Sequence, residues 1–191
     1  FGPASAMIGV GLFVNPALVE AELCGASTPT VSGTIPDSIT ATTTEGTTVS
    51  LDHTQLGRAA TIIDVGARTS GVGTNGVLVA LMAALTESDL QMLANTTAYP
   101  DSPNYRHDGN GSDHDSLGLF QMRPTAGWGS VAELMDPIYQ AAAFYGGPGA
   151  PNRVSPRGLL DIPHWDALSL GAATQAVEVS ASPDRYAAFE P

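Results

Sequence analysis

The chain has 191 residues, a net charge of −12, and seven basic residues that are all arginine. Apolar residues make up 43% of it, which is enough for the core of one domain of ordinary size. An acidic surface repels phosphate backbones and anionic lipids, so nucleic-acid and membrane-surface binding are not expected, and Cys24, the only cysteine, excludes an internal disulfide.

The first 48 residues differ in composition from the rest of the chain. Residues 1–25 form an apolar tail, in which the stretch "MIGVGLFV" at residues 7–14 is too short to span a bilayer. We expect this tail to be the trailing end of a signal or anchor segment, with a strand or a loosely docked arm as alternatives. Residues 26–48 are rich in Thr and Ser and predict a flexible stalk, with a short edge strand at residues 37–43 as an alternative.

Helical patterns run through residues 49–191, which we take as the folded domain. Asp52 can cap a helix, and Gln55 stands three residues later in the capping-box position. Apolar residues at helical spacing then mark one face of this helix: Leu56, Ala60, Ile63 and Ala67. A second helix is predicted from residue 74 or 75 to residue 88, and because it is apolar nearly all round it should be the central, buried helix.

A long polar loop and several shorter helices are predicted next. Residues 95–116 are rich in Asp, Asn, Gly and Ser, and a loop of this length in a compact domain is usually functional or ordered by internal pairing. The pair Ser130 and Glu133 forms a second capping box, and Asp136 before Pro137 starts another helix. Two more helices are predicted, at residues 169–180 and 183–189. The domain is therefore expected to be mainly α, with at most a small β-hairpin in the polar loop.

The central helix ends on a glutamate, Glu87, with no Lys or Arg within four residues of it. A carboxyl group that is half in the core and half in a cleft is poorly solvated, which raises its pKa. An acid that keeps its proton near neutral pH can protonate the bridging oxygen of a glycosidic bond. On the pattern alone, a glutamate pointing into solvent is the more common arrangement.

Two short motifs favour a catalytic Glu87 over a glutamate that points into solvent. The segment "ESDL" at residues 87–90 and "DSLGLFQ" at residues 115–121 resemble, in order and spacing, the two leading motifs of the lysozyme-like lytic transglycosylases. An "RP" and a "GWG" after the second motif fit the same family, in its actinobacterial, secreted or cell-surface branch. The resemblance covers about residues 50–190. It implies a lysozyme-like α-helical domain preceded by an extended N-terminal segment, which acts on peptidoglycan at the MurNAc-β-1,4-GlcNAc bond.

The resemblance also implies roles for individual residues. Glu87 would be the catalytic acid and then the base, and Gly118 would let the backbone approach the glycan. Further substrate contacts would come from Ser88, Ser116, Leu119, Phe120, Gln121 and Trp128, with Trp165 as a second stacking or core tryptophan. The family's later Ala-x-Asn-Tyr motif is matched by residues 142–145, with Phe144 in place of Asn and Tyr145 as the tyrosine. Tyr186 is the candidate for a late tyrosine that contacts the catalytic Glu.

The polar loop offers second carboxylates in Asp108, Asp113 and Asp115, with Asp115 at the start of the second motif, before its Gly-Leu-Phe-Gln part. A hydrolase would use such a group to activate water, whereas a transglycosylase needs none, because the C6 hydroxyl of the sugar attacks. These aspartates could instead brace the loop, so the transglycosylase is favoured modestly. Zinc is not expected in the segment 107–115, and a Ca²⁺ ion that braces the loop is a minor alternative, so no cofactor is required.

Two further interpretations remain open at this point. The domain could bind glycan without cutting it, because Phe144 departs from the family motif. It could also serve a cell-envelope assembly such as a secretion, conjugation or phage apparatus. The expectation is a monomeric, secreted or cell-surface enzyme that faces the cell wall and acts on glycan strands.

Overall fold

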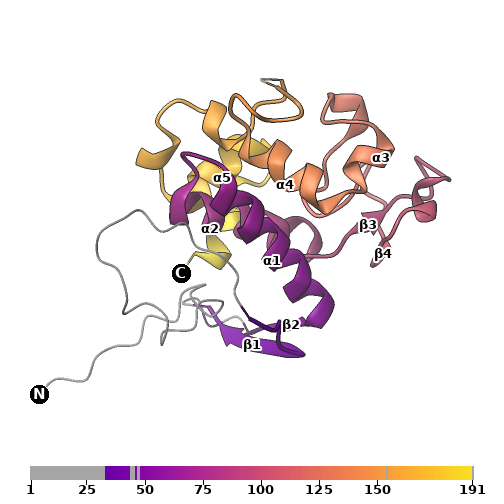
Figure 1. Cartoon of the computed structure of the whole chain (residues 1–191), viewed down its shortest axis with the longest axis horizontal. Helices are drawn as coiled ribbons and strands as arrows, with labels where there is room; N and C mark the ends of the chain where they lie inside the picture. The colour runs from indigo at the N-terminus through magenta and orange to yellow at the C-terminus, as the bar shows by residue number, and fades with distance from the viewer. Residues whose placement is uncertain (1–32, 44–45, 47, 154, 191) are drawn as a thin grey trace, which may run out of the picture.

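The computed structural model describes residues 33–43, 46, 48–153 and 155–190. The predicted apolar tail, Cys24 and residues 26–32, 44–45 and 47 of the Thr- and Ser-rich segment lie outside these residues. The described part is mostly helical, with two small two-stranded sheets (Figure 1).

The helical body is built around α2 (Gly73–Ser88), which packs against α1 (His53–Arg68), α4 (Pro137–Tyr145), α5 (Leu170–Glu178) and the 3-10 helix η7 (Pro183–Phe189). The central position predicted for α2 is confirmed, since residues 79–84 are all buried. A run of six buried residues surrounds the whole helix circumference, so α2 needs neighbours on every side. Five short helices complete the described part: α3 (Val131–Leu134), η3 (Ser102–Asn104), η4 (Pro124–Ala126), η5 (Leu159–Asp161) and η6 (Trp165–Ala167).

The helix starts follow the predicted capping signals. Asp52 accepts a hydrogen bond from the Gln55 amide at 2.9 Å, and the Gln55 side chain accepts one from the Asp52 amide at 2.8 Å, which completes the capping box of α1. The same reciprocal pair joins Ser130 and Glu133 at α3. The apolar face of α1 is shifted from the predicted one, because Ala59 is fully buried and Ala60 is only partly so.

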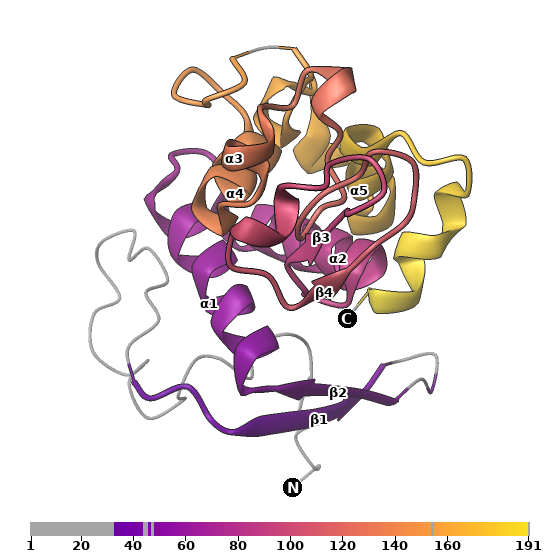
Figure 2. The ribbon, with the colours of Figure 1, turned by 90° about the vertical axis from the view of Figure 1, so that its right-hand side faces the viewer.

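The strands agree with the prediction in part, because β1 (Ser38–Thr42) matches the alternative of a short edge strand at residues 37–43. Strands β1 and β2 (Thr48–Asp52) form an antiparallel hairpin in which Ile39 faces Leu51, so the predicted stalk ends in this hairpin and its boundary at residue 48 falls inside it. Figure 2 shows the hairpin beneath the helical body, joined directly to α1. In place of a hairpin within the polar loop, β4 (Gly109–Asn110) in the loop pairs in parallel with β3 (Leu93–Ala94), which directly precedes the loop. Residues 183–189 form a 3-10 helix.

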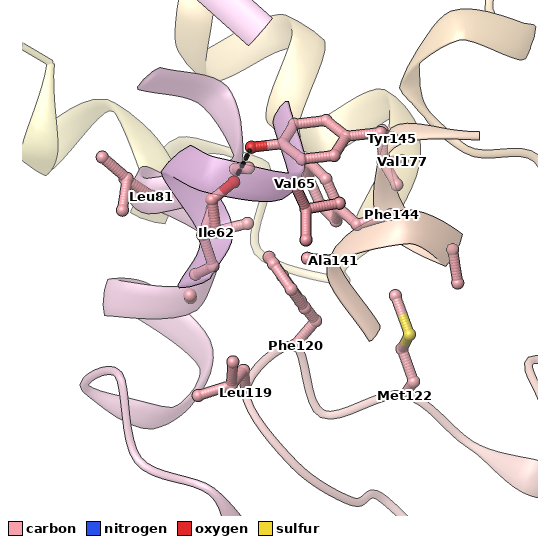
Figure 3. Close-up of a cluster of buried hydrophobic side chains, with 14 of the residues drawn as sticks. Ile62, Val65, Leu81, Leu119, Phe120, Met122, Ala141, Phe144, Tyr145 and Val177 are labelled. Carbon is pink, nitrogen blue, oxygen red and sulfur yellow. Dashed lines mark hydrogen bonds between the residues drawn. The ribbon is translucent and has the colours of Figure 1, made fainter. Parts of the chain in front are cut away.

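The core surrounds α2 and is closed by α1, α4, α5 and the segment that follows the polar loop, part of which Figure 3 shows. Phe120 stacks on Phe144 with ring centroids 4.5 Å apart, and Tyr145 meets Phe144 edge-on at 6.1 Å. The Tyr145 hydroxyl donates a hydrogen bond to the Ile62 carbonyl of α1 at 2.9 Å. These three aromatic rings therefore bind α4 to α1 and to the "GLFQ" segment.

Candidate active site

Glu87 lies in the last turn of α2, where the helix is ended by an unusual turn. Asp89 and Leu90 both adopt left-handed backbone conformations, with φ of 55° and 58°. The Leu90 amide bonds back to the Ala84 carbonyl at 3.1 Å, and the buried Leu90 side chain anchors the turn in the core. Gln55 of α1 donates to the Asp89 carbonyl at 2.8 Å, so the turn that follows Glu87 is fixed from a second helix.

The carboxyl group of Glu87 is held by the C-terminal segment of the chain. The Tyr186 hydroxyl donates a hydrogen bond to Glu87 Oε1 at 2.5 Å, and Arg185 Nη2 lies 3.5 Å from Glu87 Oε2. Arg185 also donates to the Thr86 carbonyl at 2.9 Å, which fixes its guanidinium beside the helix end. The Glu87 side chain is 13% exposed, so it neither points into open water nor is sealed in the core.

The neighbours of Glu87 correct one expectation from the sequence. No basic residue lies near Glu87 along the chain, yet Arg185 faces it in space. Both contacts are stronger when Glu87 is a carboxylate, because a phenol and a guanidinium donate to negative charge. Burial raises the pKa of Tyr186 well above its usual range, and the hydrogen bond to Glu87 raises it further, so this tyrosine keeps its proton and remains a donor.

Ser88 joins the helix end to the "GLFQ" segment. Its hydroxyl donates to the Leu119 carbonyl at 2.7 Å, and also lies 3.2 Å from the Ala84 carbonyl of its own helix. Ser88 is buried, so its side chain fixes the backbone beside Glu87 and does not face a cleft. The two motifs of the sequence are therefore in direct contact, although residues 91–114 separate them in the chain.

Gly118 serves packing, which corrects the role expected from the sequence. Its φ is +73°, and a Cβ at this position would collide with the Gln140 side-chain amide and with the Leu134 carbonyl. Gln140 is fully buried on α4 and makes three hydrogen bonds: it donates to the carbonyls of Leu117 and Leu134 and accepts from the Phe120 amide. Gln140 was not predicted as a site residue, because in the sequence it is only one polar residue on an apolar helix.

Several predicted substrate contacts belong to the interior of the protein. Leu119, Phe120 and Tyr145 have no exposed surface, so their side chains support the site from within and do not line a groove. Ser116 is also buried, and its carbonyl accepts a hydrogen bond from Asn95. Trp165 packs against the core, which agrees with the less specific of its two predicted roles.

Gln121 and Trp128 do line a pocket, of about 430 Å³. Its walls are four segments: residues 121–123, the pair Ala126 and Trp128, residues 155–157, and residues 176–179 at the end of α5. Gln121 has a left-handed backbone with φ of 47°, and its side chain donates to the Gly118 carbonyl at 2.9 Å. The pocket has the size and the mixed tryptophan, arginine and carboxyl lining of a site for a polar ligand.

Two of the three aspartates singled out in the polar loop, Asp108 and Asp115, brace it. Asp115 accepts hydrogen bonds from Thr125 Oγ1 at 2.5 Å and from Tyr99 at 3.2 Å, and it pairs with Arg123. Burial disfavours the Asp115 carboxylate, but the bonds from Thr125 and Arg123 outweigh it and hold the pKa of Asp115 well below its usual range. Asp115 is thus an ionised structural group, which corrects its candidacy as a water-activating base.

Asp108 also braces the loop, whereas Asp113 lies at the surface. Asp108 pairs with Arg58 at 3.0 Å and accepts the Met92 amide at 2.8 Å, which ties the loop to α1 and to β3. Asp113 is 76% exposed and pairs with the neighbouring His114, so it is also no partner of Glu87. Within the described residues, no three His, Cys, Asp or Glu side chains gather to hold a metal ion.

Two features of the whole chain complete the description. Among the residues that the structure describes, no helix is both long and apolar enough to cross a bilayer. In comparisons with known proteins, no protein-family model matches the chain, and no curated protein matches it significantly.

Proposed function

We propose that this protein cleaves the MurNAc-β-1,4-GlcNAc bonds of peptidoglycan, with a lysozyme-like helical domain and Glu87 as the catalytic group. The observation that carries the proposal is the environment of Glu87. A largely shielded carboxyl at the end of the central helix contacts Tyr186, and the next residue is bonded to the "GLFQ" segment. This is the arrangement that the resemblance to lytic transglycosylases implies for the catalytic glutamate.

The reaction uses one carboxyl group twice. Glu87 gives its proton to the oxygen between MurNAc C1 and GlcNAc C4, and the C1–O bond breaks as positive charge develops at C1. The Glu87 carboxylate then accepts the proton of the C6 hydroxyl while O6 bonds to C1 of the same MurNAc. The products are a 1,6-anhydro end and a free GlcNAc C4 hydroxyl, and Glu87 is protonated again.

The state of the loop aspartates supports a transglycosylase over a hydrolase. A hydrolase of this type uses a second carboxylate to activate water. Asp108 and Asp115 are engaged by arginines, and Asp113 is exposed beside His114. A mechanism in which the sugar supplies its own nucleophile needs none of them.

The proposal extends to where the protein works. A domain that cuts peptidoglycan acts as a secreted or cell-surface protein that faces the cell wall, and we propose that it works as a monomer without a cofactor. Service in a secretion, conjugation or phage assembly is compatible with this activity, because such assemblies need local gaps in the wall.

Turbidity of purified cell walls tests the proposal. Glu87→Gln keeps the shape of the side chain but cannot donate a proton, so the rate should fall at least about 100-fold. Glu133→Gln is the matched control, because an exposed glutamate is changed to a residue that also suits its capping box. An unchanged rate in Glu87→Gln, or intact walls with the wild type, would overturn the proposal; the second result would favour a binding module.

Mass spectrometry of the soluble products separates the two reactions. Anhydro ends are lighter than hydrolysed ends by one water, about 18 Da. A transglycosylase yields anhydro ends throughout the reaction. Reducing MurNAc ends from the first time point would identify a hydrolytic muramidase and contradict the proposed nucleophile.

A further inference from the structure

The pocket lined by Gln121 and Trp128 is not used by the cleavage step, yet its lining is unusual for so acidic a chain. The chain has 7 basic residues against 19 acidic ones, and two of the arginines, Arg123 and Arg157, line this one pocket. We call it the arginine pocket. Its volume of about 430 Å³ suits a small ligand. Two guanidinium groups in one small concave site favour an anionic ligand over a neutral one.

The two guanidinium groups differ in how far they are already engaged. Arg123 pairs through Nε with Asp115, so part of its guanidinium is occupied. Arg157 is exposed, and its side chain forms neither a hydrogen bond nor an ion pair with another residue of the described part of the chain. An arginine keeps its charge and carries five N–H donors that fit carboxylate oxygens. Arg157 can therefore receive an anionic group without first giving up a partner.

Glu178, the acidic residue in the lining of the pocket, does not oppose such a ligand. Burial raises the pKa of Glu178 well above its usual range, and the charge of Glu87 raises it further, so the carboxyl favours its uncharged form. Its Oε1 is shielded from solvent and has no hydrogen-bond partner among the described residues, which suits an uncharged carboxyl better than a carboxylate. Within the described residues, Glu178 forms no ion pair with either arginine of the pocket.

The opposite part of the wall is apolar and is held in place by hydrogen bonds. Trp128 and Pro156 supply apolar surface there. The Tyr139 hydroxyl donates to the Trp128 carbonyl at 3.0 Å, and the Asn152 side chain donates to the Pro156 carbonyl at 2.8 Å. A Cβ added to Gly127 would lie 3.7 Å from Pro156 Cδ, so these two segments of the wall touch. The pocket is therefore formed before a ligand arrives, which lowers the ordering cost of binding.

The "GLFQ" segment connects the arginine pocket to the proposed catalytic site. Gln121, the last residue of this segment, lines the pocket, and its side chain donates to the Gly118 carbonyl at 2.9 Å. Two residues earlier, the Leu119 carbonyl accepts the hydrogen bond from Ser88, which directly follows Glu87. The pocket and the end of α2 thus adjoin the same short segment, as two parts of one substrate site would.

We propose that the arginine pocket binds an acidic peptide, with Arg157 paired to a peptide carboxylate and Trp128 against the apolar part of the peptide. The inference rests on the proposed function, which identifies this peptide as the stem that MurNAc carries in peptidoglycan. Where the lactyl group of MurNAc is joined to a stem by an amide bond, the free carboxylates are on the peptide. The apolar part of the wall favours a peptide over a simple inorganic anion, which would meet only the arginines. Arg157 is then a specificity-determining residue.

An NMR titration of the full chain with N-acetyl-L-Ala-D-Glu tests this binding without any cleavage. The indole N–H signal of Trp128, assigned with Trp128→Phe, should shift, whereas that of Trp165, which packs against the core, should not. The diamide of the same peptide has no carboxylate and should bind at least about tenfold more weakly. Equal affinities for the peptide and its diamide, or an unmoved Trp128 signal, would overturn the inference.

Free MurNAc distinguishes the two sources of a carboxylate in peptidoglycan. Its lactyl carboxylate is not amidated, but it lacks the peptide, so MurNAc should bind more weakly than N-acetyl-L-Ala-D-Glu. Tighter binding of MurNAc would place the anion on the sugar and contradict a peptide site.

Arg157→Gln tests the arginine itself. It should weaken binding of the peptide by at least about tenfold and leave that of the diamide within about twofold. Arg153→Gln is the matched control, because Arg153 is an exposed arginine of the same loop that does not line the pocket. It should leave both affinities unchanged. If the two variants weaken peptide binding equally, the effect is one of net charge and the inference fails.

Cleavage of uncross-linked glycan strands supplies the second readout. Wild type should cut strands that carry stems at least about fivefold faster than strands whose stems an amidase has removed, and Arg157→Gln should lose most of this preference. Equal wild-type rates would overturn the inference. If wild type cleaves walls and Glu87→Gln does not, but the peptide does not bind, the inference fails while the proposed function stands. If the peptide binds but walls stay intact, the proposed function fails while the peptide site is supported.

Discussion

Replacing Gly118 by alanine tests how the "GLFQ" segment is supported. The left-handed φ of +73° costs an L-residue about 1–2 kcal/mol. The added Cβ also collides with the Gln140 amide and with a backbone carbonyl, so Gln140 must move. It makes three buried hydrogen bonds, and losing two of them costs about 2 kcal/mol. We therefore expect a loss of about 3–4 kcal/mol, a large part of the stability of an ordinary domain.

Urea unfolding of the full chain, followed by circular dichroism, measures this loss. Gly57→Ala is the matched control: Gly57 lies in α1 and a Cβ added there would meet nothing within 4 Å, so alanine should be neutral or stabilise the helix by up to about 1 kcal/mol. The packing argument is refuted if the free energy of unfolding of Gly118→Ala lies within about 1 kcal/mol of the wild-type value while its KM for cleavage is strongly raised. That result would show that Gly118 serves the approach of the glycan.

Three further predictions concern buried polar groups. Tyr145→Phe removes the hydroxyl bonded to Ile62 and should lower stability by about 1 kcal/mol without changing KM; a raised KM in a stable variant would return Tyr145 to the substrate site. Asp115 has a lowered pKa, so its contribution is present above its unfolded pKa of about 3.9 and is lost as pH falls toward the folded value. Acid unfolding of Asp115→Asn should therefore show a weaker pH dependence than that of exposed Asp113→Asn. Glu178 has a raised pKa, so the folded state binds more protons than the unfolded state above about pH 4.3, and stability falls as pH rises. Glu178→Gln should thus gain stability relative to wild type between about pH 4 and pH 8. If the free energies of unfolding of the variant and the wild type depend on pH in the same way, the raised pKa of the Glu178 carboxyl is contradicted.

The elements that could be predicted are those whose signals act over one or two turns. The capping boxes at Asp52 and Ser130, the Asp136–Pro137 start and the apolar circumference of α2 are all confirmed. Capping depends on a side chain and an amide three residues apart, and burial of a whole helix surface depends on its own composition. The β1–β2 hairpin was not predicted as such, because a Thr-rich stretch suits both a stalk and a strand.

The residues of the site likewise fall into those that could be predicted and those that only the tertiary structure revealed. The sequence pattern placed Glu87 at the end of a buried helix, and the resemblance to lytic transglycosylases selected Tyr186 as its candidate neighbour. Only the tertiary structure brought Arg185 to Glu87 and showed Gly118 packed on Gln140. The physical reason is that a carboxyl group responds to whatever charges lie within several ångströms. Those neighbours come from η7, about a hundred residues along the chain, and their positions are decided by how helices pack and not by any local pattern.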